Sequence, residues 1–570
     1  MYRKLLPYLR PYWGRIFGSS LCSVLEAAFE LTIPLLLAAM LDRGIGTGNI
    51  SLTLKLGGLM LLLAVLVFLC GVGSVILATG AGTGFSADLR QAQFQHIQHF
   101  SFRDMERFGS ASLITRMTSD VNAVQTAVFQ CVKQVVRASS MVLVAAIMSV
   151  RLSARLSSMY VILIPALVVF LVALVRSVRP FYRELQEATD GMNLVTEENL
   201  IAIRTVKAFG QESSEQRRFE SVSKSVFRAA DRAYGRSASG SPGVTAFTHI
   251  AMLILLGYGG LLVVRGSATI GVLTGFITYI SQVFNQMFSL SNAILVLNRS
   301  LVSAQRINEV LGVVPEMQDG SETVMDSGQV AFRNVTFSYG SSEPVLRGIS
   351  LEVSSGQTLG IVGAIGSAKS TLVQLIPRLY DVTEGSVEVD GRDVRQYSME
   401  TLRQQVAIVL QESMLFSGTI RENLQWSDPT ADETAMISAC KLAGAWEFVS
   451  GFPEGLDTVL GQGGANLSGG QRQRLCIARA LVGHPKVLIL DDSTSAVDTA
   501  TEAKIRQALF TSLPNTTKIV ISQRIRSIRD ASQILVLDQG RISDVGTHAE
   551  LFHRNEIYHQ MCMSQKEGVA

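Results

Sequence analysis

The chain has 570 residues, of which 48% are hydrophobic and only 17% are charged, and its mean hydropathy is +0.30. Soluble globular chains carry about 25% charged residues, so this composition excludes a disordered, collagen-like or disulfide-stabilised protein and indicates a membrane protein. The 50 basic and 47 acidic residues leave a net charge of +3, which gives no support for nucleic-acid binding.

Long apolar runs dominate the first half of the chain. A helix that spans a bilayer needs about 20 mostly apolar residues. The runs are Phe17–Leu41, Leu56–Ala78, Val135–Val150, Ser158–Val175, Val244–Val264 and Ile270–Leu297. A buried helix of a soluble domain is an alternative for any one run, but six together predict six membrane spans. The third run is short, so its limits stay open.

Basic residues predict how these spans are oriented. The segments between spans 2 and 3 and between spans 4 and 5 are long and rich in Arg and Lys, whereas the opposite connections are short. This bias places both long segments, both termini and the second half of the chain in the cytoplasm. Glu187–Tyr234 is polar with recurring apolar positions, which predicts helices extending beyond the bilayer. The start, MYRKLLPYLRPYWGR, suits an interfacial elbow helix rather than a signal peptide, which favours a bacterial plasma membrane.

The character of the sequence changes after the last apolar run. Residues 1–312 are expected to form the transmembrane domain, the polar stretch Val313–Ser327 a linker, and 328–570 a mixed α/β domain with a partly parallel sheet, because short β-rich runs alternate there with helical ones. The predicted strands are Val330–Tyr339, Thr358–Val362, Val487–Leu490, Lys518–Ser522 and Ile534–Leu537.

A strand, a glycine-rich turn and a helix follow one another in TLGIVGAIGSAKSTL. The turn fits a phosphate-binding loop, in which backbone N–H groups surround phosphate oxygens at a helix N-terminus. Lys369 is expected to reach the β- and γ-phosphates of ATP, and the Ser370 hydroxyl to bind Mg²⁺. The nucleotide-binding residues predicted here are Gly363, Ala364, Ile365, Gly366, Ser367, Ala368, Lys369, Ser370 and Thr371.

One position of this loop departs from the pattern G-x-x-x-x-G-K-[ST]. Ala368 stands where the pattern has glycine. We expect the methyl group to be tolerated if φ stays negative or the turn shifts slightly, with nucleotide binding retained and weakened.

Two carboxylates end the apolar run VLILDD. In P-loop NTPases, an aspartate at the end of such a strand holds Mg²⁺, often through water. Asp491 takes that position, and Asp492 follows it. Two acidic residues at a strand end are common by themselves, but downstream of a phosphate loop they indicate a metal-nucleotide site.

The sequence NLSGGQRQR between these elements resembles the LSGGQ signature of ATP-binding cassette (ABC) transporters, here with Ser468, Gly469, Gly470 and Gln471. Other motifs of that family follow in order. FSYG resembles the stretch whose aromatic residue, Tyr339, stacks on adenine; VLQES supplies the Q-loop glutamine Gln411, which the resemblance assigns to catalysis and to the Mg²⁺ ligands; and Ser495–Asp498 matches the D-loop.

This resemblance covers almost the whole chain and implies an ABC half-exporter. Its fold is then an α-helical membrane domain with six transmembrane helices, followed by an α/β P-loop ATP-binding cassette that uses ATP and Mg²⁺. Short coupling helices are expected near Ser101–Phe108 and Ile203–Gly210. Two chains are implied, because in this family each ATP lies between the phosphate loop of one cassette and the signature of the other.

Four positions around the nucleotide differ from the family. Asp492 replaces the usual catalytic Glu, Gln523 the switch His, Gln462 a Glu before the signature, and Ala368 a glycine. Three interpretations remain open: a working homodimer with tolerated substitutions, a channel or regulator that hydrolyses nothing, and one half of a heterodimer with a slow site here. The third is favoured because the signature is intact, and it predicts a partner chain with Glu and His at these positions.

Polar residues inside the predicted spans bear on the substrate. Glu26 and Glu30 lie one turn apart in span 1, and span 6 carries a polar stripe with Gln282, Asn285 and Gln286. Intramembrane carboxylates default to a functional hypothesis, here attraction of a cationic substrate, while pairing with another helix is the alternative. Amide-mediated helix packing is equally an alternative for the stripe. A hydrophobic small molecule or cationic drug is the leading substrate prediction, with lipid, peptide or siderophore as alternatives.

Overall fold

The computed structural model describes residues 4–315, 317–340 and 343–567. It contains two compact units. One consists of Met1–Gln98 and Ala111–Val313, and the other of His99–Ser110 and Val314–Ala570. His99–Ser110, from the segment that the sequence predicts to be the first cytoplasmic extension, therefore belongs to the same unit as the cassette.

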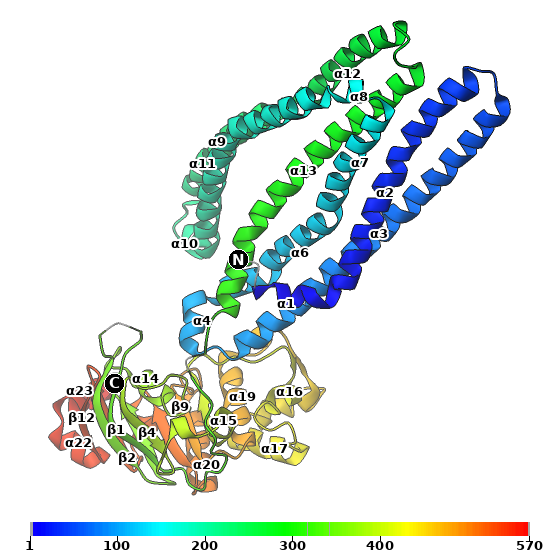
Figure 1. Ribbon diagram of the computed structural model, residues 1–570. Coiled ribbons are helices and arrows are strands. Elements are labelled where there is room, and N and C mark those ends of the chain that lie inside the picture. Colours follow the sequence, from blue (N-terminus) through cyan, green and yellow to red (C-terminus); the bar gives the residue numbers. More distant parts are fainter. Residues whose placement is uncertain (1–3, 316, 341–342, 568–570) are drawn as a thin grey trace. The chain divides into compact units, whose positions relative to one another are not determined.

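The first unit is entirely helical in its described residues (Figure 1). Its longer elements are α2 (Trp13–Ala39), α3 (Ile50–Gln98), α7 (Val136–Leu152), α9 (Tyr160–Ile201), α11 (Glu212–Ala238), α12 (Gly240–Val264) and α13 (Ile270–Leu311). Its shorter ones are α1 (Leu6–Leu9), α5 (Ser110–Thr115), α6 (Val121–Phe129), α8 (Ala154–Ser157) and α10 (Ile203–Ala208), with π-helical turns at Met40–Ile45, Arg116–Asp120 and Gln130–Val135.

Several of these helices are long and apolar enough to cross a membrane. Among the described residues, five helical segments meet this criterion: Leu6–Ile45, Ile50–Gln98, Ser110–Leu152, Ala154–Ile201 and Glu212–Val264. They contain five of the six predicted spans. The sixth, Ile270–Leu297, lies within the helix α13 and stays a prediction. The short third run proves to be part of a helix that continues well before it.

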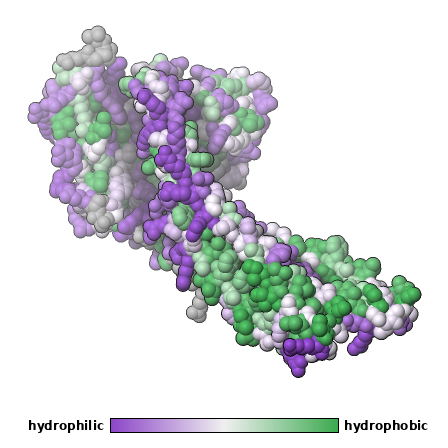
Figure 2. All heavy atoms as spheres, turned by 90° about the horizontal axis from the view of Figure 1, so that it is seen from above, coloured by the Kyte–Doolittle hydropathy of each residue, from purple (hydrophilic) through white to green (hydrophobic). Residues whose placement is uncertain are grey.

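Apolar side chains cover the outside of this unit rather than its interior alone. Figure 2 shows a broad hydrophobic area on the face in view. On α3, exposed Leu54, Leu61 and Phe68 recur every seven residues and so share one face of the helix. Such a surface is stable against lipid and not against water. The chain is therefore a multi-pass membrane protein, as its composition predicts.

The second unit contains a sheet of six strands in the order β12-β11-β3-β10-β9-β6. β3 (Thr358–Val362), β6 (Val406–Val409), β9 (Val487–Asp491), β10 (Thr517–Ile521) and β11 (Gln533–Asp538) are parallel, and β12 (Arg541–Gly546) is an antiparallel edge. All five residues of β3 and of β9 are buried, as expected for strands covered on both faces. The predicted partly parallel sheet is confirmed.

A second, antiparallel sheet has the order β2-β1-β4-β5. It consists of β1 (Val330–Phe337), β2 (Leu346–Val353), β4 (Glu384–Val389) and β5 (Arg392–Asp393), and a short pair joins β7 (Gly418–Thr419) to β8 (Val459–Leu460). The helices are α4 (Phe102–Phe108), α14 (Lys369–Gln374), α15 (Met399–Gln405), α16 (Ile420–Leu424), α17 (Glu433–Leu442), α18 (Trp446–Val449), α19 (Gly469–Val482), α20 (Thr499–Ser512), α21 (Ile525–Ile528), α22 (His548–Arg554) and α23 (Glu556–Glu567).

Most of the predicted linker runs along this unit. The Gly320 N–H donates to the Tyr397 carbonyl at 3.1 Å, and the Glu322 N–H donates to the Gln396 carbonyl at 3.0 Å. Glu322 also pairs with Arg392 at 2.5 Å. These bonds attach the stretch to the edge of the antiparallel sheet.

Candidate nucleotide-binding site

The predicted site residues follow four neighbouring parallel strands. The glycine-rich loop follows β3, Asp492 follows β9, Gln523 lies two residues beyond β10, and Gln411 lies two residues beyond β6. Because the carboxyl ends of parallel strands meet at one edge of a sheet, residues distant in sequence come to one crevice there.

The loop after β3 has the backbone of a phosphate cradle. Gly366 has φ +82°, and a Cβ placed there would meet no atom within 4 Å, so the loop is open on that side. A Cβ at Gly363 would lie 2.1 Å from the Leu537 carbonyl oxygen, which excludes every larger residue. The Lys369 Nζ donates to the Gly363 carbonyl at 3.0 Å and to the Ala364 carbonyl at 2.8 Å. Burial lowers the pKa of Lys369, against the opposing effect of the nearby aspartates.

Ala368 corrects one expectation about this loop. Its φ of +70° and ψ of +26° are left-handed, so the alanine keeps the backbone conformation of glycine instead of a negative φ. The reason is that α14 starts directly after it, and the helix N-terminus sets the path of the loop. An L-residue in this conformation costs about 1–2 kcal/mol.

Two of the three residues predicted to hold Mg²⁺, Ser370 and Asp491, are adjacent. The Ser370 Oγ donates to the Asp491 Oδ1 at 3.1 Å, and Asp491 is buried at the end of β9. Burial raises the pKa of Asp491, while the Ser370 bond and Lys369 lower it. A hydroxyl and a carboxylate beside a phosphate cradle are the oxygen ligands that Mg²⁺ prefers. The residues thus fit MgATP, with Ser370 and Asp491 on the metal side and Lys369 on the phosphate side.

The two substituted positions, Asp492 and Gln523, lie side by side. Asp492 has φ +45°, and its N–H donates to the Ile521 carbonyl at 3.0 Å. Burial raises the pKa of Asp492, and Arg524 together with a backbone hydrogen bond from Gln523 lowers it. The short carboxylate is therefore held toward the loop after β10. The Gln523 and Gln411 side chains are exposed.

Gln565 of α23 holds the loop that carries Gln523. Its Nε2 donates to the Gln523 carbonyl at 2.7 Å, and its Oε1 accepts from the Ile525 N–H at 2.9 Å. The amide side chain thereby replaces two backbone partners that a loop outside the sheet lacks.

Tyr339, the predicted adenine contact, lies in an aromatic cluster that reaches α4. Its Oη lies 3.0 Å from the Thr371 Oγ1, and its ring meets Tyr380 edge-on at 5.2 Å. The Tyr380 hydroxyl donates to the Glu106 Oε1 of α4 at 2.9 Å, and burial together with this bond raises the pKa of Tyr380. Ser101 caps α4, a short helix at the predicted position of the first coupling helix. The second predicted position also carries a short helix, α10.

The signature residues begin α19. The Ser468 Oγ accepts from the Gln471 N–H, and the Gln471 side chain accepts from the Ser468 N–H, so both orphan donors are satisfied. Ser468 itself stays exposed. Gln473, which the sequence analysis does not single out, joins this helix to the D-loop through the Ser495 Oγ at 3.2 Å and the Ala496 N–H at 3.0 Å.

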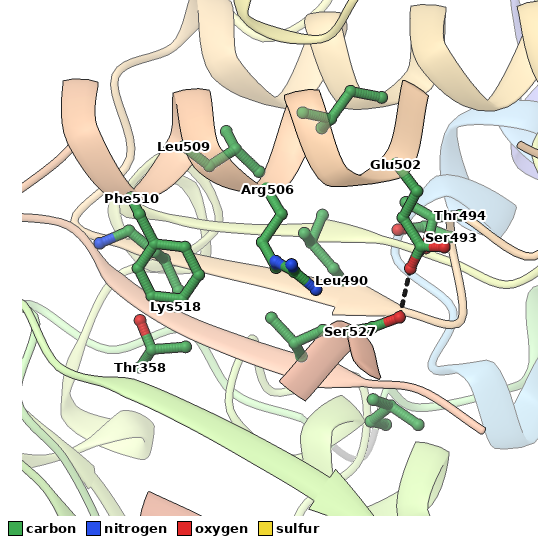
Figure 3. A pocket seen from close by; sticks show the side chains of 13 residues that line it. Thr358, Leu490, Ser493, Thr494, Glu502, Arg506, Leu509, Phe510, Lys518 and Ser527 are labelled. Atoms are coloured by element: carbon green, nitrogen blue, oxygen red, sulfur yellow. Dashed lines mark hydrogen bonds between the residues drawn. The ribbon is translucent and has the colours of Figure 1, made fainter. Parts of the chain in front are cut away.

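A buried carboxylate behind the D-loop was also missed. Glu502 accepts from Ser527 and Thr494, and its Oε2 accepts from the Arg524 Nη1 at 2.8 Å. Figure 3 shows the hydrogen bond between Glu502 and Ser527 as a dashed line. Both residues are part of the lining of a cavity of about 40 Å³. Arg524 also donates to the Ser495 carbonyl at 3.2 Å, which ties the loop after β10 to the D-loop. No spacing in the sequence signals this cluster, because its members come from three separate elements.

The predicted substrate residues lie in the other unit. Glu26 and Glu30 of α2 both pair with Arg137 of α7, each at 2.9 Å. On α13, Asn285 is exposed, while the Oε1 atoms of Gln282 and Gln286 are buried and accept no hydrogen bond from the described residues. Arg137 lies inside the third apolar run, Val135–Val150, and the sequence analysis does not single it out.

Comparisons with known proteins agree with this architecture. The model of the ABC transporter transmembrane region matches residues 16–287, and the ABC transporter model matches residues 346–495. The chain is 36% identical over 571 residues to the uncharacterized ABC transporter ATP-binding protein YfiB of Bacillus subtilis (strain 168), covering 99% of each chain. It is 30% identical over 564 residues to an ATP-dependent lipid A-core flippase of Syntrophus aciditrophicus (strain SB), covering 98% of this chain and 94% of that one.

A solved structure shares the fold. The structure of a bacterial Atm1-family ABC exporter with ATP bound superposes with a TM-score of 0.81 at 26% identity, over 97% of this chain and 99% of the other. Transmembrane region, ATP-binding domain and fold therefore coincide on one polypeptide, and the chain belongs to the ABC transporter family as a half-transporter subunit of an exporter that couples ATP to transport.

Proposed function

We propose that this chain is one subunit of a heterodimeric exporter with two unequal ATP sites, located in the plasma membrane with its cassette in the cytoplasm. Its own phosphate loop forms the slow site, with Lys369, Ser370 and Asp491 binding MgATP. Its signature serves the hydrolytic site of a partner chain that carries Glu and His where this chain has Asp492 and Gln523.

The observation that carries the proposal is the contrast between the two motifs. The phosphate side combines a strained Ala368, a short Asp492 and an amide at Gln523. A carboxylate one methylene shorter stands roughly 1 Å back, and such a displacement costs on the order of 100-fold in rate. An amide supplies no imidazolium charge to a γ-phosphate. The signature, by contrast, is complete, capped and exposed at Ser468.

Exposed apolar surface supports a second chain. On the cassette, Phe416 and Trp426 stack at 4.0 Å and are both exposed beside the exposed Met414, along a groove of about 390 Å³. In the helical unit, the exposed Ile201 and Phe209 flank α10. Apolar residues of this kind outside the bilayer need cover, which the partner subunit provides.

The cargo proposed is a hydrophobic or cationic small molecule, moved by alternating access as ATP binding draws the cassettes together. Glu26, Glu30, Gln282, Asn285 and Gln286 are the proposed substrate residues. A homodimeric lipid exporter is the second candidate, favoured by the similarity to a lipid A-core flippase.

The test compares the chain alone with the chain paired. The purified chain is expected to hydrolyse ATP little, and co-expression with a half-transporter bearing the catalytic Glu and switch His is expected to give substrate-stimulated hydrolysis. ATP turnover is measured for both preparations in lipid nanodiscs. Vigorous turnover by the isolated chain would favour the homodimer and reject the asymmetric pair.

A further inference from the structure

Three charged side chains from two helices meet inside the helical unit. The Arg137 Nε donates to the Glu26 Oε1 and its Nη2 to the Glu30 Oε2, both at 2.9 Å, so one guanidinium bridges two carboxylates. Glu26 is 8% exposed, and the side chains of Glu30 and Arg137 are 26% and 20% exposed. Glu30 and Arg137 therefore form the accessible part of the triad, and Glu26 its buried end.

The charges of this triad do not cancel. Two carboxylates against one guanidinium leave one negative charge in a membrane-spanning region. On the neighbouring α3, Gly71 faces Glu26, with 3.5 Å from an ideal Cβ to the Glu26 Cδ. The other cation nearby in sequence, Lys133, lies one turn before Arg137 and makes no ion pair with either carboxylate among the described residues. An unbalanced charge in a low dielectric is costly unless a counter-charge arrives.

Buried oxygen atoms near this triad also lack hydrogen-bond donors among the residues that the structure describes. The Glu26 Oε2 is buried and accepts no hydrogen bond within the described part of the chain. The Oε1 atoms of Gln282 and Gln286 are in the same state. These glutamines follow Tyr279 by one and two turns of α13, and Tyr279 contacts α2 by donating to the Leu31 carbonyl at 2.7 Å. All three unsatisfied atoms are acceptors, so the missing group is a donor or a cation.

We propose that Glu26, Glu30 and Arg137 form a site for an organic cation of single charge, and that Arg137 sets this charge selectivity. The proposal rests on the exporter function above and names the substrate class. The ligand is a protonated amine or quaternary nitrogen on an apolar body, held by Glu30 at the accessible end. Arg137 stays paired with Glu26 and neutralises the charge of that carboxylate. Only the negative charge of Glu30 is then left for the ligand, so a doubly charged ligand would keep one positive charge without a partner.

The experiment uses two planar dyes that differ mainly in charge, the monocation ethidium and the dication propidium. Binding of each is measured by fluorescence to the full-length chain in lipid nanodiscs without ATP. The wild type is expected to prefer ethidium. Arg137→Gln leaves two carboxylates unbalanced, and the affinity ratio should shift toward propidium by about tenfold or more, since one charge a few ångströms away is worth that much in a protein interior. Glu30→Gln should weaken ethidium binding by about tenfold.

Two controls separate charge from folding. Arg137→Lys keeps the charge and loses the two-fold hydrogen bonding, so the dye ratio should stay that of the wild type even where stability falls. Lys133→Gln removes a cation one turn away and should leave the ratio unchanged. The proposal is overturned if the ratio of ethidium to propidium affinity does not change in Arg137→Gln, or if it changes by the same amount in Lys133→Gln. The proposal is also overturned if Glu30→Gln leaves the affinity for ethidium unchanged. That result would mean that a bound proton, and not an organic cation, neutralises the excess negative charge. The binding measurements contain no ATP and so do not depend on transport. A chain that binds the dyes as expected but exports nothing would therefore contradict the exporter function and not the proposed binding site.

Discussion

Ala368 has the left-handed backbone conformation that favours glycine, although it carries an alanine side chain, and it is the N-cap residue of α14. Its φ of +70° stores strain that a family-typical glycine would not. Asp492, one of the two substituted catalytic positions, also has a left-handed backbone, with φ +45°. Strain of this kind persists only where surrounding structure enforces it, and here helix α14 and strand β9 do so.

Ala368→Gly is expected to stabilise the cassette. Relief of the left-handed alanine should contribute about 1 kcal/mol, a rise of roughly 2–4 °C in the melting temperature of a domain this size. Ala364→Gly is the matched control in the same loop, because Ala364 is not among the left-handed residues described; it should lower stability. Thermal unfolding of the full chain in detergent measures both. A fall in melting temperature with Ala368→Gly would contradict the strain.

The buried Asp491 predicts a pH effect of defined sign. Burial raises its pKa in the folded chain, so the protonated form is favoured by folding and stability is lost as pH rises through that pKa. Asp491→Asn should therefore raise the melting temperature at neutral pH and flatten its decline from acid to neutral pH, while Mg²⁺-dependent nucleotide binding is lost.

Asp498 supplies the opposite control. Hydrogen bonds from the first turn of α20, chiefly from Thr501, lower the pKa of this exposed carboxyl. Its contribution is present at neutral pH and lost as pH falls through the lowered pKa. Asp498→Asn should leave neutral stability equal or lower. Melting curves from acid to neutral pH that show the same sign for both variants would refute the burial argument.

Helix α4 shows how a short element is attached to the cassette. Its seven residues are too few to be stable alone. A capping box at Ser101, the Tyr380–Glu106 hydrogen bond and the contact of Phe102 with Tyr380 at 5.9 Å hold it. Tyr380 also touches Tyr339, so the attachment of this helix and the predicted adenine contact share one side chain.

Tyr380→Phe should loosen α4 while leaving the aromatic cluster in place. Loss of one hydrogen bond to a carboxylate costs about 1.5 kcal/mol, or roughly tenfold faster local opening. Hydrogen exchange over residues 101–108 measures this. Tyr397→Phe is the matched control, because its buried hydroxyl donates to the Val389 carbonyl at 3.1 Å within the sheet. It should change exchange around β4 and not in α4. Unchanged protection of α4 in Tyr380→Phe would show that the bond contributes nothing.

Across the whole molecule, the two ATP-site motifs of one chain are expected to serve different sites. The phosphate loop lies at the carboxyl edge of the parallel sheet, and the signature lies on α19 with Ser468 exposed. In an asymmetric pair, the signature of this chain contributes to the fast ATP site and its phosphate loop to the slow one. Substitutions at the two motifs of this chain should therefore reduce ATP hydrolysis unequally, whereas in a symmetric dimer they should reduce it equally.

In the reconstituted pair, Ser468→Ala in this chain should reduce ATP turnover by about 100-fold, because it touches the competent site, while Asp492→Ala should cost less than about threefold. Ser468→Ala also removes a helix cap, worth about 1 kcal/mol. Ser398→Ala removes the equivalent cap of α15, where the Ser398 Oγ accepts from the Thr401 N–H at 3.2 Å, and should leave turnover near the wild type. Equal losses from Ser468→Ala and Asp492→Ala would argue for two equivalent sites.

The sequence by itself determined the family and most of the strands of the parallel sheet, and it predicted the residues of the ATP site. These features depend on local spacing, such as the loop from Gly363 to Thr371 between an apolar strand and a helix, and local spacing is read directly from the chain. The departures at Asp492 and Gln523 were visible there too, because the resemblance to ABC transporters sets which residues are expected at these two positions.

Only the tertiary structure decided the contacts between distant segments. The pairing of Glu26 and Glu30 with Arg137 joins residues 111 and 107 positions apart, and the bond from Tyr380 to Glu106 joins residues 274 apart. No periodicity encodes such pairs, since they depend on which helix faces pack together. The conformation of Ala368 was decided in the same way, because the helix and strands around it outweigh the preference of its own side chain.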